Sequence, residues 1–171
     1  MAVTFFSGKK EFRSLSNFWE KEITLNGRTY ETGEHCFHGE KYTLVGELNQ
    51  NQKLIDYGKT FQSPSVYKTP NLAKQKGKGL RLSESELIDW YKMSLDVQKR
   101  ICQSKLQHHE VHQDLLKSGD RILIHPAMRC SEEKVKERIW EGRAVLVDGE
   151  LKVFGANQLG EIWMEFRKSL K

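Results

Sequence analysis

The sequence predicts an α+β fold: one mostly helical domain with short antiparallel strands. Asn26-Gly27 and Asp148-Gly149 each separate two short runs of strand-forming residues, which is the typical signal of a tight β-hairpin. Between these hairpins, apolar residues from Leu87 to Ile101 recur at close to helical spacing. No internal repeat, low-complexity run or linker divides the 171 residues, so we predict a single domain spanning 1–171.

Local signals then predict the elements in order. Strands are expected at Val3 to Phe6, Glu22 to Leu25, Arg28 to Tyr30 and Arg121 to Ile124, and on both sides of the turn within Val145 to Phe154. Helices are expected from about Thr32 to Val45, Gln52 to Tyr57, Pro70 onward, Ser83 through Ile101, His109 to Lys117 and Leu159 to Leu170. We predict that Thr32 caps the first helix, that Pro70 occupies the first helical position of the third, and that Gly119 closes the fifth in a left-handed conformation.

Composition limits the classes of protein. The formal net charge of +5 and the pI of about 9.0 suit a polyanionic ligand, although this modest excess decides little by itself. The three cysteines are odd in number and form no Cys-x-x-Cys, which argues against a disulfide framework and a thiolate zinc site. We therefore expect a reduced, cytoplasmic protein. No apolar run resembles a signal peptide or a membrane span, so no membrane partner is expected.

The ten residues from Thr32 to Lys41 carry two carboxylates, two imidazoles, a thiol and an ammonium. Glu34 falls in the first turn of the expected helix, where the helix dipole favours a negative charge. A carboxylate held there beside aromatic rings suits the stabilisation of a developing cation. The ordinary interpretation is that surface helices often begin with Glu.

The segment Leu15 to Trp19 places an amide, Asn17, beside two aromatic rings that include Phe18. A pocket for a flat base needs this combination, because rings stack on the base while an amide recognises its edge. Alternatively, the rings belong to the core and Asn17 is a turn residue.

A basic loop is expected where Lys74, Lys76, Lys78 and Arg81 alternate with Gly77 and Gly79. Such a loop can bring ammonium groups and backbone amides to phosphates. It lacks the Gly-Lys-Ser/Thr ending of a nucleoside-triphosphate loop. The alternative is a solvated basic surface.

Two weaker patterns remain. His108 and His112 have the i, i+4 spacing of metal ligands on one helix, but no third ligand is evident, so we predict neither a metal nor a cofactor. Asn157 and Gly160 stand where a loop enters the last helix, a place that suits an anion or equally an ordinary cap.

Taken in order, short segments across nearly the whole chain resemble the NADAR family of YbiA-like proteins. The segments that carry the resemblance are Ser16 to Trp19, Tyr30 to Lys41, Trp90 with Met93, Lys105-Leu106, Ser118 to Asp120, and Asn157 through Gly160 with Met164 and Arg167. Each segment is short, but six in the same order are fairly specific.

The resemblance implies a YbiA-like α+β fold and metal-independent N-glycosidase chemistry, a hydrolase activity on ribosylated substrates. Family members are associated with removing ADP-ribose from modified guanine in nucleic acid, or with cleaving phosphorylated intermediates of riboflavin synthesis. The expected partner is thus an ADP-ribose-containing or phosphorylated ribosyl substrate, with single-stranded nucleic acid as a further partner. A non-catalytic module that binds ADP-ribose or nucleic acid is the alternative.

Roles for individual residues follow from the resemblance and the chemistry together. Glu34 is expected to stabilise the cationic transition state, and Glu137 to orient water or take its proton. Glu137 stands where the family carries Asp, so either it replaces that residue or the activity is altered or lost. The expected substrate-binding residues are Asn17, Phe18, His35, Phe37, Lys41, Trp90, Trp140, Asn157 and Gly160, and the expected phosphate-binding residues are Lys74, Lys76, Lys78 and Arg81.

Overall fold

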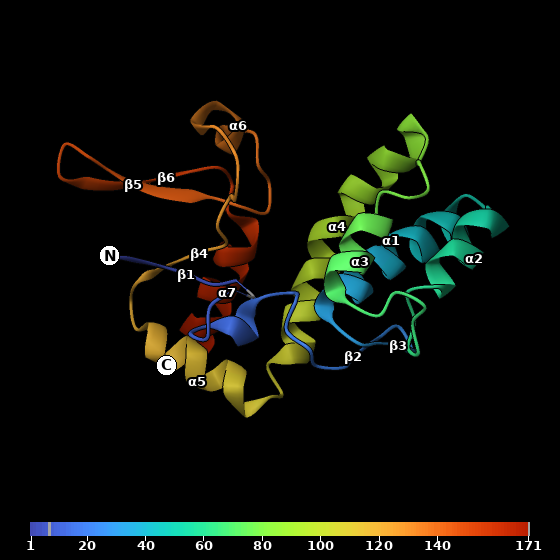
Figure 1. Cartoon of the computed structure of the whole chain (residues 1–171), viewed down its shortest axis with the longest axis horizontal. Coiled ribbons are helices and arrows are strands. Elements are labelled where there is room, and N and C mark those ends of the chain that lie inside the picture. The colour runs from blue at the N-terminus through green and yellow to red at the C-terminus, as the bar shows by residue number, and fades with distance from the viewer. Residues whose placement is uncertain (7, 171) are drawn as a thin grey trace. The chain divides into compact units, whose positions relative to one another are not determined.

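A computed structural model describes residues 1–6 and 8–170, in which seven α-helices, one short 3-10 helix and six short strands are found (Figure 1). The chain divides into two compact units, one made of Asn17–Lys105 and the other of Met1–Ser16 with Leu106–Lys171. The single domain expected from the sequence stays a prediction.

The unit of Asn17–Lys105 is a helical bundle that carries one hairpin. Its elements are β2 (Ile23–Leu25), β3 (Arg28–Tyr30), α1 (Gly33–Leu48), α2 (Gln52–Lys59), α3 (Pro70–Lys76) and α4 (Glu84–Lys105). Helix α1 packs against α2, α3 and α4, so it forms the centre of this unit. Its core includes Tyr30, Tyr42, Phe61 and Ile101, which are all fully buried.

Short-range signals explain how these helices begin. The side chains of Thr32, Asn51 and Thr69 accept hydrogen bonds from backbone amides of the first turns of α1, α2 and α3. At the start of α4, Ser83 and Glu86 form a reciprocal capping box: the Glu86 amide donates to Ser83 Oγ at 3.3 Å and the Ser83 amide donates to Glu86 Oε2 at 2.7 Å. These predicted helix starts are confirmed.

The hairpin β2–β3 is fastened to α1 by a buried ion pair. Arg28 donates to both carboxylate oxygens of Glu40, at 3.1 and 2.6 Å, and Glu40 is completely buried. Tyr30 Oη also donates to Glu40, at 3.2 Å. These hydrogen bonds compensate the carboxylate for its burial, and hydrogen bonding to it raises the pKa of Arg28.

The unit of Met1–Ser16 and Leu106–Lys171 holds the remaining elements. These are β1 (Ala2–Thr4), the 3-10 helix η1 (Arg13–Leu15), α5 (His109–Ser118), β4 (Ile122–Ile124), α6 (Glu132–Lys136), β5 (Arg143–Val147), β6 (Glu150–Phe154) and α7 (Gln158–Ser169). Trp163 of α7 is fully buried, and its indole N–H donates to the Leu15 carbonyl at 2.9 Å. This bond ties the last helix to η1.

Both predicted hairpins are antiparallel, and in each turn the Asn26-Gly27 or Asp148-Gly149 pair has positive φ at both residues. The third pairing differs from the expectation of antiparallel strands, because β1 and β4 pair in parallel, with Val3 opposite Leu123. Parallel partners lie far apart in the sequence, so no local turn signal announces them. The expected left-handed cap at Gly119 is also wrong in detail: its φ is +58° but its ψ is −129°.

Candidate active site

The carboxylate of Glu34 is held by its own helix. Its Oε1 lies 2.9 Å from His38 Nε2, one turn further along α1, and both side chains are only 12% exposed. The backbone amide of Glu34 donates to the Asn17 carbonyl at 2.9 Å, which fixes the start of α1 against the preceding segment. Glu34 is thus oriented, largely shielded from water and placed at the positive end of a helix dipole.

His38 is the residue of this site that sequence analysis missed. Its Nδ1 is buried and has no hydrogen-bond partner within residues 1–6 and 8–170. A Cβ added at Gly77 would lie 2.2 Å from that nitrogen, so glycine is required where the ring approaches the backbone. The i, i+4 spacing of Glu34 and His38 on one helix was the signal that could have revealed the pair.

Lys41 joins α1 to the segment that follows α3. Its Nζ donates to the carbonyl of Gly77, and Tyr42 Oη donates to the same oxygen at 3.0 Å. Burial lowers the pKa of Lys41 to about 8; the charge of Lys78 lowers it as well, while the Glu34 carboxylate opposes both. The Lys41 ammonium therefore interacts electrostatically with both the Glu34 carboxylate and the Lys78 ammonium.

The predicted basic loop is partly helical. Lys74 and Lys76 belong to the last turn of α3, where positive charge suits the helix dipole, and Lys78 follows the helix end. All four cations of this basic segment (Lys74, Lys76, Lys78 and Arg81) are exposed. Lys74 Nζ lies 5.7 Å from the centre of the Phe18 ring, close enough for a cation–π contact. The structure therefore gathers Glu34, Lys41, Phe18 and the basic segment around the start of α1.

Asn17 and the nearby aromatic residues are more enclosed than expected. The Asn17 side chain exchanges hydrogen bonds with the Gln98 amide, donating at 2.8 Å and accepting at 3.1 Å. Trp90 is 5% exposed and contacts the partly buried Phe37 edge to face at 5.1 Å between ring centres. Packing already accounts for these groups, so contact with a substrate stays a prediction for each of them.

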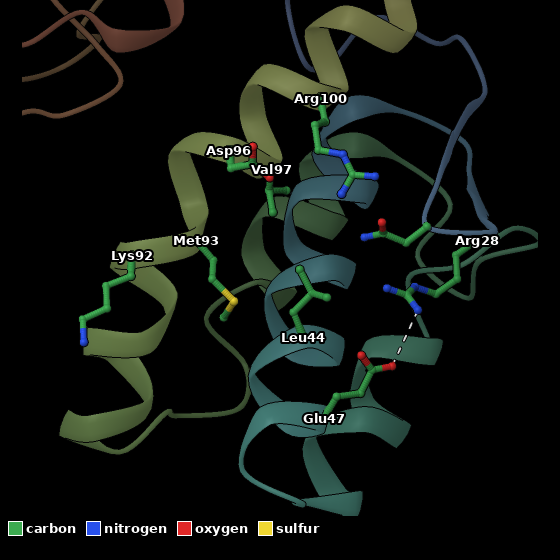
Figure 2. A pocket seen from close by; sticks show the side chains of 9 residues that line it. Arg28, Leu44, Glu47, Lys92, Met93, Asp96, Val97 and Arg100 are labelled. Carbon is green, nitrogen blue, oxygen red and sulfur yellow. Dashed lines mark ion pairs between the residues drawn. The ribbon is translucent and has the colours of Figure 1, made fainter.

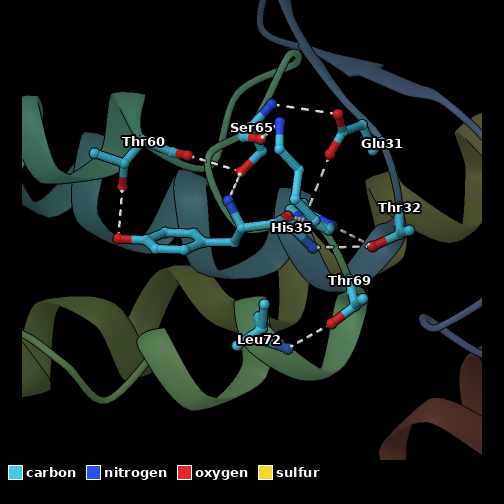
Figure 3. Close-up of polar contacts among 9 residues, drawn as sticks. Glu31, Thr32, His35, Thr60, Ser65, Thr69 and Leu72 are labelled. Carbon is cyan, nitrogen blue, oxygen red and sulfur yellow. Dashed lines mark hydrogen bonds and ion pairs between the residues drawn. The ribbon is translucent and has the colours of Figure 1, made fainter.

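His35 occupies a network beneath the loop from Thr60 to Thr69 (Figure 3). Its Nδ1 lies 2.8 Å from Thr32 Oγ1 and its Nε2 lies 2.7 Å from the Tyr67 carbonyl, and the side chain is 1% exposed. Both ring nitrogens therefore have protein partners. This arrangement favours a structural role that anchors the loop to α1, and the predicted contact with substrate is untested.

Four predicted residues belong to the unit of Met1–Ser16 and Leu106–Lys171. Glu137 is exposed and follows α6 directly, while Trp140 is partly buried.

The other two, Asn157 and Gly160, lie at the start of α7. Asn157 is 1% exposed; its Nδ2 donates to the Leu123 carbonyl at 2.9 Å and its Oδ1 accepts from the His125 amide at 3.0 Å. Gly160 lets α7 approach β4, since an added Cβ would lie 2.2 Å from the Leu123 carbonyl oxygen. Side-chain capping of α7 by Asn157 is not found.

The histidine pattern on α5 has a simple explanation at one of its positions: His112 Nε2 lies 2.6 Å from the Leu106 carbonyl. In the described part of the chain, no group of three or more His, Cys, Asp or Glu side chains is placed to hold a metal ion. No helix among the same residues combines the length and the apolarity needed to cross a bilayer.

Comparison with known proteins identifies the family. The NADAR domain model matches residues 4–171. A riboflavin biosynthesis protein of Vibrio vulnificus is 24% identical over 170 residues, which are 99% of this chain but only 38% of that protein. The N-glycosidase YbiA of Escherichia coli is 24% identical over 169 residues, covering 98% of this chain and 88% of the relative.

The solution NMR structure of Escherichia coli YbiA supports the fold. It superposes with a TM-score of 0.63 over 99% of this chain and 84% of its own, at 20% sequence identity. At that identity the likeness concerns the fold alone, and it confirms the predicted α+β, YbiA-like class. With the family model matching residues 4–171, the chain belongs to the NADAR family.

Proposed function

We propose that this chain is an N-glycosidase that hydrolyses the C1′–N bond of a phosphorylated or ADP-ribosylated substrate. The observation that carries the proposal is the shielded Glu34 carboxylate, bonded to His38 at 2.9 Å beside Lys41 and the basic segment. The names of the YbiA relatives as N-glycosidases support it.

The chemistry follows from these groups. As the C1′–N bond breaks, positive charge builds on the ribose, and a carboxylate beside the sugar stabilises that charge. Water then supplies oxygen to C1′, and its proton goes to the leaving base nitrogen. Lys41 and the basic segment would hold the phosphates, while Phe18 would contact a ring of the substrate.

For the substrate, we propose an ADP-ribosylated base, guanine in single-stranded nucleic acid. The net charge of +5 and the four exposed cations of the basic segment favour the larger polyanion. Phosphorylated intermediates of riboflavin synthesis are the second candidate, because a Vibrio vulnificus relative is named a riboflavin biosynthesis protein.

A turnover experiment tests both the activity and the substrate. The protein is incubated with excess single-stranded DNA that carries ADP-ribosylated guanine and, separately, with the phosphorylated pyrimidine precursors. We expect release of ADP-ribose from the DNA, and we expect Glu34→Gln to lower the rate by roughly two to three orders of magnitude. Glu84→Gln is the matched control, since Glu84 is an exposed first-turn glutamate of α4.

The other outcomes separate the alternatives. Cleavage of the pyrimidine precursors alone would reverse the choice of substrate. Near-normal turnover by Glu34→Gln would remove Glu34 from the mechanism. Binding of ADP-ribose with no product from either substrate would identify a non-catalytic binding module.

A further inference from the structure

A pocket lies on another side of α1 from the candidate active site. It has a volume of about 480 Å³ and lies between α1, α4 and the β2–β3 hairpin, all within the unit of Asn17–Lys105 (Figure 2). Leu44, Met93 and Val97 supply its apolar surface, and charged side chains surround them. This volume lies in the range that accommodates small organic ligands.

This pocket shares no residue with the candidate active site. Successive residues of an α-helix are about 100° apart around its axis, so Leu44 lies roughly 60–120° and Glu47 roughly 120–180° around α1 from Glu34, His38 and Lys41. Arg28, which lines the pocket, is paired with the buried Glu40 and not with Glu34. Substitutions in the pocket and in the candidate active site can therefore show which of the two sites a ligand occupies.

Two guanidinium groups face this pocket. Arg28 comes from β3 and Arg100 from α4, and Figure 2 shows both on the same side of α1. Arg28 is bonded to Glu40 at 2.6 Å, whereas its contact with the half-exposed Glu47 is longer, at 3.7 Å. Arg100 is partly buried and has no hydrogen bond or ion pair to any residue of 1–6 and 8–170. A partly desolvated guanidinium without a carboxylate is suited to bind an oxyanion.

Two carboxylates, Glu47 and Asp96, line the same pocket. A simple anion would be repelled by them, whereas a ligand with hydroxyl groups could donate hydrogen bonds to their oxygens. The apolar Leu44 and Met93 add a surface on which a flat ring can lie, and a thioether makes favourable contacts with aromatic rings. The ligand should thus combine an oxyanion, hydroxyl donors and a planar ring.

We propose that this pocket binds a nucleoside monophosphate. The phosphate lies against Arg100 and the exposed edge of Arg28, the ribose hydroxyls donate to Glu47 or Asp96, and the base lies on Met93 and Leu44. This binding site does not depend on the proposed glycosidase activity.

Calorimetric titration of the full chain with AMP tests the proposal, with adenosine and inorganic phosphate as partial ligands. We expect AMP to bind at least about tenfold more tightly than either partial ligand. Arg100→Gln should weaken AMP about tenfold or more, the scale of one charge-assisted hydrogen bond. Lys53→Gln, which changes an exposed cation of α2, is the charge-matched control and should bind AMP normally. Lys78→Gln, in the basic segment, tests whether AMP binds at the candidate active site instead.

Shift mapping by NMR on the unaltered chain gives a readout that does not depend on the folding of a variant. Perturbed amides are expected within 26–28, 44–47 and 92–100. Perturbation confined to 74–81, or weaker binding by Lys78→Gln but not by Arg100→Gln, would place AMP in the candidate active site and overturn the proposal. Equal affinity for inorganic phosphate and AMP, or no binding of AMP, would overturn it too.

Discussion

At the scale of single residues, the contact between Glu34 and His38 decides how the carboxylate is presented. The His38 imidazole can donate from Nε2 to Glu34 because the two side chains lie one helical turn apart, with Nε2 2.9 Å from Glu34 Oε1. Such a donor orients the carboxylate without removing its charge. His38 is therefore a positioning residue for the proposed reaction.

This role predicts different outcomes for two substitutions of His38. Glutamine retains an N–H donor, so His38→Gln should keep most of kcat, whereas His38→Leu should lower kcat about tenfold or more through loss of a hydrogen bond to a charged group. Full activity of His38→Leu with an unchanged pH profile would show that the contact is dispensable.

The lowered pKa of Lys41 predicts that anion binding depends on pH. Burial lowers its pKa to about 8, so its ammonium loses the proton well below the usual value of 10.5. We expect the affinity for ADP-ribose to fall as the pH rises through about 8, and we expect Lys41→Met to remove this step while Lys53→Met retains it. Calorimetric titration between pH 6.5 and 9.5 would measure the effect, and an identical profile in Lys41→Met would exclude Lys41 as its source.

Lys41 affects folding stability in the opposite direction: as the pH rises, the affinity for the anion falls but the free energy of unfolding increases. Between the lowered pKa of about 8 and the usual 10.5, the unfolded chain retains a proton on Lys41 that the folded chain has lost. Lys41 therefore makes the free energy of unfolding rise with pH across this window. Urea unfolding of the protein and of Lys41→Met would show the difference as a smaller rise in the variant.

At the scale of elements, the basic segment is held against α1 by its backbone rather than by its charged side chains. Lys41 and Tyr42 both donate to the Gly77 carbonyl, and Tyr42 Oη also lies 2.7 Å from the Leu80 carbonyl. The four cations therefore remain exposed and available to a ligand. An element anchored in this way can bind phosphates without rearrangement.

Changing Lys74, Lys76, Lys78 and Arg81 together to Ala should flatten the salt dependence of binding to single-stranded DNA. Each lost phosphate contact reduces the slope of log affinity against log salt concentration by about 0.7. A fourfold change of the exposed Lys9, Lys10, Lys53 and Lys168 is the charge-matched control. Equal slopes for the two variants would mean that the basic segment is merely solvated surface.

At the scale of the whole molecule, the two carboxylates that the sequence predicts to be catalytic belong to different units. Glu34 belongs to the unit of Asn17–Lys105, and Glu137 belongs to the other. If Glu137 takes a proton from water in place of the family's Asp, Glu137→Gln should lower kcat by about a hundredfold or more. Glu133→Gln, an exposed residue in the first turn of α6, is the control. Equal activity of the two variants would leave Glu34 as the only proposed catalytic carboxylate.

The elements of this chain were largely predictable from sequence, because short-range signals determine them. The Asn26-Gly27 and Asp148-Gly149 turns, the Thr32 cap and Pro70 at the start of α3 all act within a few residues. The 3-10 helix η1 was not predicted, since it is too short to show a hydrophobic period. The family was also recognisable, because its segments keep their order along the chain.

The arrangement of side chains was decided by tertiary structure. Sequence indicated Glu34 and the basic segment separately, but only packing shows His38 between Glu34 and Gly77, and Asn17 joined to Gln98. It also shows both His35 nitrogens bonded within the protein and leaves Arg100 facing a pocket. Local sequence determines where helices and turns begin, whereas the partner of a polar group depends on residues far along the chain that meet only when the unit is packed.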